Sequence, residues 1–298
     1  MASLSQIVSL PFVTGFALQN YSQAEKSIID ASIAGYQYWY IDGSMSSDIP
    51  KNWDINRIKN MISLIEQYNV RPIYHGNFKV PLSSDVDEIR LAAIQYTKKE
   101  IDLASELSAP LIIHGGAVVE PRLVNKVKKE ALNNFLYSLD DLSRYARSKN
   151  VIIYLENLSN YQNYRPFHYI FTHEKEFDFI LSETDAKFFL DLGHANIGND
   201  SPGAIFQKYH QRIVGMSFSN NNGQHDQHLS LKKGTIDYSE IVAAICSVGW
   251  KGMIAFETRD ASPGKSMIDL ADIYHHYCSA ELLIPMRKVN INYNTLLF

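Results

Sequence analysis

The sequence predicts a single (β/α)₈ barrel, and two observations carry that prediction. First, eight short apolar runs alternate with segments of helical period, which is typical of parallel βαβ units. Second, six of these runs end at, or run directly into, an Asp, a His or a Glu. The predicted strands are residues 10–16, 38–42, 70–75, 110–114, 151–156, 186–191, 213–219 and 252–257.

The segments between the predicted strands have the spacing of amphipathic helices. In the clearest one, the apolar residues advance by three or four positions and therefore share one helix face. These residues are Leu123, Val127, Ala131, Phe135, Leu139, Leu142 and Ala146. The same pattern recurs at Ile58, Met61, Ile65 and Tyr68. Eight such strand and helix units close into a barrel, and an open doubly wound sheet is the main alternative.

The polar residues at the strand ends distinguish these two folds. They are Asp42, His75, His114, Glu156, Asp191 and Glu257. In a parallel barrel the carboxyl ends of all strands meet on one face, where the active site lies. An open sheet would spread the same residues along a line, too far apart for one site. The pattern therefore favours a barrel with a site at its mouth.

Length and composition fit one globular domain. The chain has 298 residues, a length at which barrels commonly form a single domain, and two domains are the weaker interpretation. Hydrophobic residues make up 46% and charged residues 20%, which is globular rather than disordered composition. We expect the barrel to occupy residues 1–280 and a short tail without an assigned role to occupy residues 281–298.

Charge and cysteine content limit the partners and the compartment. The formal net charge of −4 counts against nucleic acid as a partner, because nucleic-acid binders usually carry a basic surplus. The two cysteines, Cys246 and Cys278, are too few for a disulfide framework and fit a reducing compartment. No apolar run approaches the roughly 20 residues that cross a bilayer. We expect a cytoplasmic protein without membrane association, and a homo-oligomer is one option for its assembly.

Three carboxylates at strand ends are the centre of the candidate site. Glu156, Asp191 and Glu257 each close an apolar run. A single buried carboxylate is costly unless it is paired, so each one alone could belong to a salt bridge at the barrel mouth. Three that converge need a cation or shared protons, and this favours a metal site.

Histidines accompany the carboxylates. They are His75, His114, His194 and His228. His194 lies three residues after Asp191, on what we expect to be a loop leaving the strand, and His228 lies two residues after Asp226, as in an extended segment. Imidazole combined with carboxylate suits zinc, manganese, cobalt or iron. A lone histidine at a strand end is more often a structural polar residue, so each motif is weak by itself.

Four sequence motifs resemble the xylose isomerase-like superfamily of sugar isomerases and epimerases, which is related to endonuclease IV. The motifs are Ile-Tyr-Leu-Glu156, Asp191-Leu-Gly-His194, Asp226-Gln-His228 with the later Gly234-Thr-Ile-Asp237, and Ile-Ala-Phe-Glu257. The resemblance spans about residues 70 to 260. It implies that Glu156, Asp191 and Glu257 ligate one divalent ion, with Glu156 and Glu257 as the catalytic acid and base.

The chain departs from this family pattern on the seventh strand. The resemblance implies a histidine there as a further ligand, and the matching position is Ser217, while an acid three residues later is replaced by Asn220. We expect Ser217 and Asn220 to face the substrate instead. A hydroxyl is a poor replacement for imidazole, so the ion would bind weakly, take a water, move toward His75 and His114, or be absent.

The retained residues also resemble the metal subsites of endonuclease IV. His75, His114, Glu156 and Glu257 match one subsite. A second subsite is matched by His194, Asp226 and His228. The missing histidine belongs to the third. The resemblance therefore favours a shift of the ion toward the histidines.

Three functions are compatible with these residues. The first is a metal-dependent isomerase or epimerase, or a related dehydratase or lyase, acting on a small sugar, sugar phosphate or cyclitol by removing a proton beside a metal-bound oxygen. Arg259 could then bind a phosphate or carboxylate, or else form a surface ion pair with Asp260. The second is a phosphodiester hydrolase of the endonuclease IV type, and the third is a non-catalytic ligand-binding barrel.

Overall fold

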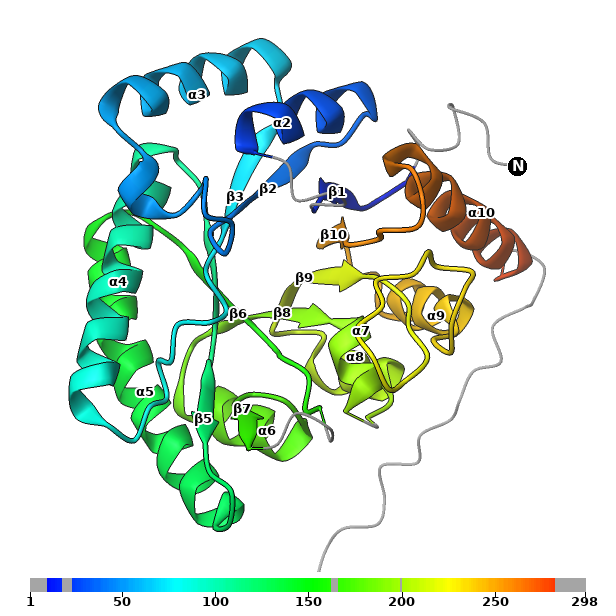
Figure 1. The fold of residues 1–298 in the computed structure, drawn as a ribbon. Coiled ribbons are helices and arrows are strands. Elements are labelled where there is room, and N and C mark those ends of the chain that lie inside the picture. The colour runs from blue at the N-terminus through cyan, green and yellow to red at the C-terminus, as the bar shows by residue number, and fades with distance from the viewer. Residues whose placement is uncertain (1–9, 18–22, 162–165, 199, 282–298) are drawn as a thin grey trace, which may run out of the picture.

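A closed barrel of eight parallel strands forms the centre of the protein (Figure 1). The computed structural model describes residues 10–17, 23–161, 166–198 and 200–281. Around the barrel the strands follow the order β1-β10-β9-β8-β6-β4-β3-β2. Their bounds are β1 (Val13–Phe16), β2 (Tyr38–Asp42), β3 (Arg71–His75), β4 (Leu111–His114), β6 (Ile153–Glu156), β8 (Lys187–Asp191), β9 (Ile213–Phe218) and β10 (Met253–Phe256). Each lies within one of the eight predicted runs, so the predicted barrel is confirmed.

Helices surround the strands, as Figure 1 shows. They are α2 (Ala24–Ile33), α3 (Ile55–Tyr68), α4 (Asp87–Glu106), α5 (Val124–Ser148), α6 (Glu174–Glu183), α7 (Leu192–Ile197), α8 (Pro202–Tyr209), α9 (Tyr238–Val248) and α10 (Pro263–Glu281), with a 3₁₀ turn η1 (Pro50–Asn52). None of the helices in the described ranges is both long enough and apolar enough to cross a bilayer. Of the predicted tail, only Glu281 is described, as the last residue of α10.

Two short strands outside the barrel were not predicted. β5 (Ala117–Val119) and β7 (Phe167–Tyr169) belong to the loops after β4 and β6 and pair antiparallel with each other. Val118 and His168 on one face of this small sheet are buried. Strands of three residues leave too short a pattern to be recognised in a sequence.

The helix after β8 corrects one prediction. We expected residues 191–194 to lie on a loop, but α7 begins directly after Asp191. The Asp191 carboxylate accepts the backbone N–H of His194 at 2.6 Å and so caps the first turn of the helix. Asp54 before α3, Ser201 before α8 and Asp237 before α9 cap their helices in the same way.

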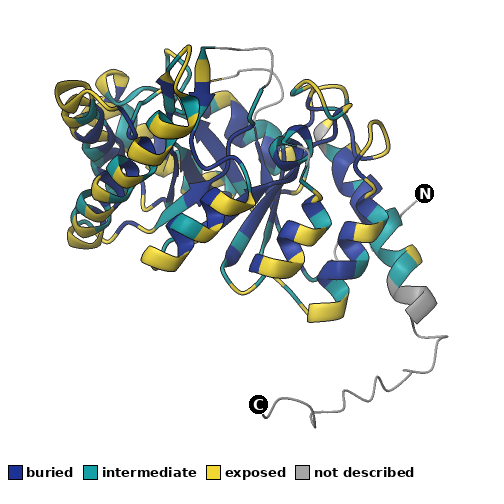
Figure 2. Cartoon of the chain, turned by 90° about the horizontal axis from the view of Figure 1, so that it is seen from below, coloured by how far each residue is buried: buried dark blue, intermediate teal, exposed yellow. Residues whose placement is uncertain are grey.

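The core has two layers, and Figure 2 shows the buried strands inside the exposed outer faces of the helices. Inside the barrel, Tyr40, Ile73, Ile112 and Phe189 are buried, and a Cβ at Gly215 would lie only 2.2 Å from the Phe189 ring. Between the barrel and the helices, α5 buries the predicted face. Its buried residues include Ala131, Phe135, Leu139, Leu142 and Ala146. Leu123 is the exception, because it precedes the helix and is 60% exposed.

A buried ion pair connects two of the outer helices. Glu176 on α6 is 3% exposed and lies 2.6 Å from Lys128 Nζ on α5 and 3.2 Å from His173 Nε2. Burial alone would raise the pKa of Glu176, but His173 and Lys128 lower it from 4.5 to about 2. Because the pKa of Glu176 is lower in the folded state than in the unfolded state, the interaction stabilises the fold at pH values above the pKa of the unfolded state. This stabilisation is lost as the pH falls through the pKa of the folded state.

We expect Glu176→Gln to reduce the free energy of unfolding by about 3 kcal/mol at pH 7, following the size of the pKa shift. The difference between the native protein and E176Q should shrink as the pH falls from about 5 toward 2, because both then carry a neutral side chain. Urea unfolding across this pH range measures it. Glu183→Gln, at the exposed end of the same helix, is the control, and a pH-independent loss in E176Q would contradict this explanation.

Candidate metal centre and active site

Six of the eleven predicted site residues share one position relative to the barrel interior. Each of the six lies two residues beyond a residue that faces the inside of the barrel. The pairs are Ile73 and His75, Ile112 and His114, Tyr154 and Glu156, Phe189 and Asp191, Gly215 and Ser217, and Ala255 and Glu257. Because side chains alternate between the two faces of a strand, these residues all point inward, one layer nearer the carboxyl ends. The strand ends therefore build one site.

A cavity of about 220 Å³ opens at this end of the barrel. Eight of the eleven predicted site residues line it, namely His75, His114, Glu156, His194, Asp226, His228, Glu257 and Arg259. Asp191 and Ser217 are absent from its lining and are almost fully buried. Aromatic and apolar side chains complete its wall, including Phe78, Leu158, Tyr161 and Tyr169.

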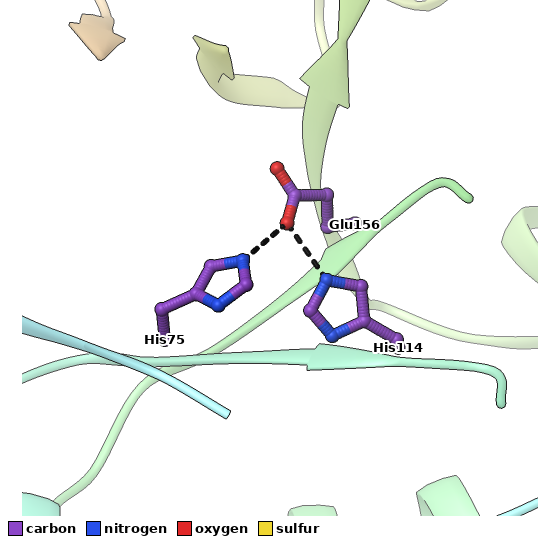
Figure 3. Close-up of side chains that lie close together, drawn as sticks. All are labelled: His75, His114 and Glu156. Carbon is purple, nitrogen blue, oxygen red and sulfur yellow. Dashed lines mark hydrogen bonds and ion pairs between the residues drawn. The ribbon is translucent and has the colours of Figure 1, made fainter. Parts of the chain in front are cut away.

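Two histidines converge on one oxygen of Glu156 (Figure 3). His75 Nε2 lies 3.0 Å and His114 Nε2 lies 2.9 Å from Glu156 Oε2. Burial would raise the pKa of Glu156, but the hydrogen bonds from His114 and His75 lower it below its usual range. Burial likewise opposes the charged form of His75, and the neighbouring Glu156 nevertheless raises its pKa to about 9. The three side chains thus form one tightly coupled group.

The other oxygen of Glu156 faces a group of carboxylates. The hydroxyl of Ser217 lies 3.0 Å from Glu156 Oε1 and 2.8 Å from Glu257 Oε1, so it bridges the two glutamates. Asp191 lies beside them, and one carboxylate oxygen from each of the three residues falls within 4.8 Å of the others. Burial, assisted by the neighbouring carboxylates, raises the pKa of Asp191 to about 8 and also raises that of Glu257. The nearest positive groups are histidines, with His194 Nδ1 3.4 Å from Asp191 Oδ2 and His228 Nδ1 3.7 Å from Glu257 Oε2.

His194 and His228 both face one oxygen of Asp226. Their Nδ1 atoms donate to the backbone carbonyls of Asn157, at 2.8 Å, and Glu257, at 2.9 Å. The Nε2 atoms therefore face Asp226 Oδ2, at 3.7 Å from His194 and 2.8 Å from His228. Burial opposes the charged form of Asp226, but the two histidines lower its pKa below its usual range. Orientation by a backbone carbonyl is common for histidines that bind metal.

The segment that carries His228 is not extended, contrary to the expectation from its spacing. His228 has a φ of 50°, in the left-handed region that only a few per cent of non-glycine residues adopt. The backbone is held there because Arg259 N–H donates to the His228 carbonyl at 2.8 Å. The turn, rather than strand alternation, brings His228 to Asp226.

The three residues expected to face a substrate have different positions. Arg259 lines the cavity, while the neighbouring Asp260 pairs with Lys233 Nζ at 2.7 Å. Ser217 is fully buried and contacts the two glutamates. The side-chain amide of Asn220 forms hydrogen bonds of 2.9–3.0 Å with the backbone of Leu231 and Ile236. These bonds stabilise the loop after β9. The geometry therefore gives no support to a substrate contact at Asn220.

Two neighbours of His75 were not named as ligands or substrate contacts from the sequence, although Asp42 was among the polar strand ends expected at the barrel mouth. The Tyr40 ring stacks on the His75 ring with centroids 5.4 Å apart and an interplanar angle of 19°. Asp42 Oδ1 lies 3.9 Å from His75 Nδ1, and both residues line the cavity. Asp42 ends a predicted strand, but it has no histidine partner close in sequence that would have marked it as a site residue.

Comparison with known proteins agrees with this geometry. Residues 29–275 match the family described as xylose isomerase-like TIM barrel. The chain belongs to this family. An uncharacterised protein of Methanocaldococcus jannaschii is 26% identical over 230 residues, which cover 74% of each chain. Among solved structures, a D-tagatose 3-epimerase-like protein is 20% identical, covers 91% of this chain and 100% of its own, and has a TM-score of 0.77. An L-ribulose 3-epimerase is 15% identical, covers 92% of this chain and 98% of its own, and has a TM-score of 0.73.

The donors of this xylose isomerase-like barrel fit a divalent cation. Two groups offer ligand atoms within 4.8 Å of one another, and both contain Glu156. One group is His75, His114 and Glu156, and the other is Glu156, Asp191 and Glu257. Burial raises the pKa values of Asp191 and Glu257 although His194 lies 3.4 Å from Asp191 and His228 lies 3.7 Å from Glu257. Nitrogen and oxygen donors together suit zinc, manganese, cobalt or iron.

Proposed function

We propose that this protein is a divalent-metal-dependent isomerase or epimerase of a small sugar or sugar-like polyol. The observation that carries the proposal is the placement of Glu156 and Glu257, which come from different strands, line one cavity and are bridged by Ser217. Two carboxylates in such an arrangement can accept and return a proton at a substrate carbon. Similarity to structures described as sugar 3-epimerases supports the same class of reaction.

We further propose that the cation is held by His75, His114 and Glu156, with Glu257 and Asp191 close by. Ser217 Oγ occupies the side of Glu156 that faces Glu257, which directs the other Glu156 oxygen toward the two histidines. A divalent cation at these donors would polarise a hydroxyl or carbonyl oxygen and make the adjacent C–H easier to deprotonate. His194, Asp226 and His228 would bind further substrate hydroxyls or a second ion.

The remaining cavity wall suits a sugar. Glu156 and Glu257 would act as acid and base, one removing a proton and the other returning it. Phe78, Tyr161 and Tyr169 offer apolar surface for the C–H face of a sugar ring. Arg259, at the outer part of the cavity, would bind a phosphate or carboxylate on the substrate.

Deuterium exchange tests the reaction across a whole class of candidate substrates at once. The protein, loaded with zinc, manganese, cobalt or iron, is incubated in D₂O with a panel of ketoses, aldoses, their phosphates and cyclitols. We expect NMR to show deuterium at the carbon beside the carbonyl of at least one compound, since proton removal precedes both isomerisation and epimerisation. Loss of water from a panel member would instead indicate a lyase.

A phosphodiester hydrolase is the second candidate, and the His194, Asp226 and His228 group favours it because clustered ions activate water in such enzymes. The net charge of −4 opposes binding of a polyanion. Chelator-sensitive cleavage of abasic DNA, without deuterium exchange in any sugar, would support this candidate. If neither reaction occurs and no metal is retained, the protein is a ligand-binding barrel.

A further inference from the structure

A buried glutamate lies directly behind the proposed metal ligand His75. Glu100 on α4 is 1% exposed, and no lysine or arginine in the described ranges forms an ion pair with it. Burial raises the pKa of Glu100 to about 8, so the side chain is largely protonated at pH 7. A buried carboxyl without a cation is costly, and it stays in a protein when its hydrogen bonds serve a purpose.

The contacts of Glu100 are with the turn that follows β3. Its Oε1 accepts the backbone N–H of Asn77 at 2.9 Å. Its Oε2 lies 3.3 Å from the point where a Cβ on Gly76 would be. The Gly76 N–H donates to the Ile112 carbonyl at 2.8 Å, and the same Cβ would lie only 2.6 Å from that oxygen. The turn is therefore held closely between α4 and β4.

We infer that Glu100 is a positioning residue that fixes the turn at Gly76 and Asn77 and thereby holds His75 against Glu156. This inference rests on the proposed metal site, because it assigns Glu100 a role in the affinity for the ion. His75 is the last residue of β3, where it pairs with Asp42 of β2 and Ile112 of β4, and the backbone that leaves the strand immediately after it is the part that Glu100 holds.

The other neighbours of His75 constrain the ring less completely. Tyr40 stacks on one face of the ring, which restricts its tilt but allows the ring to slide. Asp42 Oδ1 is 3.9 Å from His75 Nδ1, beyond hydrogen-bond distance, and it already accepts the N–H and the hydroxyl of Ser44. Strand pairing with β2 and β4 places the His75 backbone, and the contact of Glu100 with Asn77 supports the end of that strand and with it the 3.0 Å approach of His75 Nε2 to Glu156.

The test compares three substitutions in the full chain. Glu100→Gln keeps an oxygen for the Asn77 N–H and closely resembles the protonated carboxyl. Glu100→Asp shortens the side chain by one methylene and so moves its oxygens away from the Asn77 N–H. Glu100→Leu removes the oxygens and keeps a similar side-chain volume. We expect the zinc dissociation constant, measured by competition with a chromophoric chelator, to stay within about 3-fold in E100Q and to rise about 10- to 100-fold in E100D and E100L. Glu176→Gln, which is expected to be destabilised at a residue that does not line the cavity, should keep native zinc affinity.

Crystal structures of the native protein and E100D without added metal give a second readout that needs no bound ion. We expect the distance from His75 Nε2 to Glu156 Oε2 to exceed hydrogen-bond range in E100D. Native zinc affinity in both E100D and E100L, or an unchanged distance in E100D, would overturn the inference. If the native protein itself takes up no metal, the proposed function fails, and the crystal structures still decide whether Glu100 positions His75.

Discussion

Replacing Glu257 by glutamine should lower kcat by about 100- to 10,000-fold, the usual contribution of a general acid or base. Glutamine has the same shape as glutamate, and its amide can keep the 2.8 Å contact with Ser217, but it cannot exchange a proton with substrate at neutral pH. The measurement is deuterium exchange into the substrate identified from the panel. The fold should be unchanged, because Glu257 makes its side-chain contacts within the site rather than in the core.

The control for this variant is Glu240→Gln on the exposed side of α9, which should retain native activity. Metal content must be measured alongside, since Glu257 also belongs to one of the two donor groups. If E257Q retains its metal and its activity stays within a few-fold of the native value, Glu257 is not the acid or base, and the proposed chemistry at this site is wrong.

Replacing His114 by alanine should weaken metal binding by more than about 100-fold, because His114 is proposed as a direct ligand. Loss of a residue that only supports a ligand commonly lowers metal affinity by about 10- to 100-fold. Its Nε2 lies 2.9 Å from Glu156 Oε2, and its ring is buried, so water would not replace it with equal geometry. Elemental analysis after dialysis against a chelator measures the ion that the variant retains. Deuterium-exchange activity of the dialysed native protein should return when zinc, manganese, cobalt or iron is added back.

His225→Ala is a matched control, since His225 is exposed and does not line the cavity. It should bind metal as the native protein does. If H114A retains the ion and Asp191→Asn loses it, the ion lies instead in the carboxylate group of Glu156, Asp191 and Glu257. Such a result would leave the enzyme class intact but would contradict the role of Ser217 in directing Glu156 toward the histidines.

The fold could be predicted because its signals are local in sequence. Each barrel strand falls within a short apolar run, and the helix faces repeat every three or four residues, as at Phe135, Leu139 and Leu142. Regular periodicity of this kind is set by backbone geometry and does not depend on distant contacts. The small sheet of β5 and β7 could not be predicted, since its three-residue strands are specified by pairing across 48 or more residues.

The sequence predicted eight residues that line the cavity, but it did not predict how they are arranged. Glu156, Asp191 and Glu257 could be identified because each closes an apolar run, and a polar residue at the carboxyl end of a barrel strand lies at the barrel mouth. The sequence alone determined that carboxylates and histidines meet there. Only the tertiary structure decided that Ser217 bridges the two glutamates, that Asn220 braces a loop, and that Glu100 supports His75 from a neighbouring helix. The physical reason is that a hydrogen bond requires its atoms within about 3 Å, and the packing of helices on the barrel sets such distances between residues far apart in the chain.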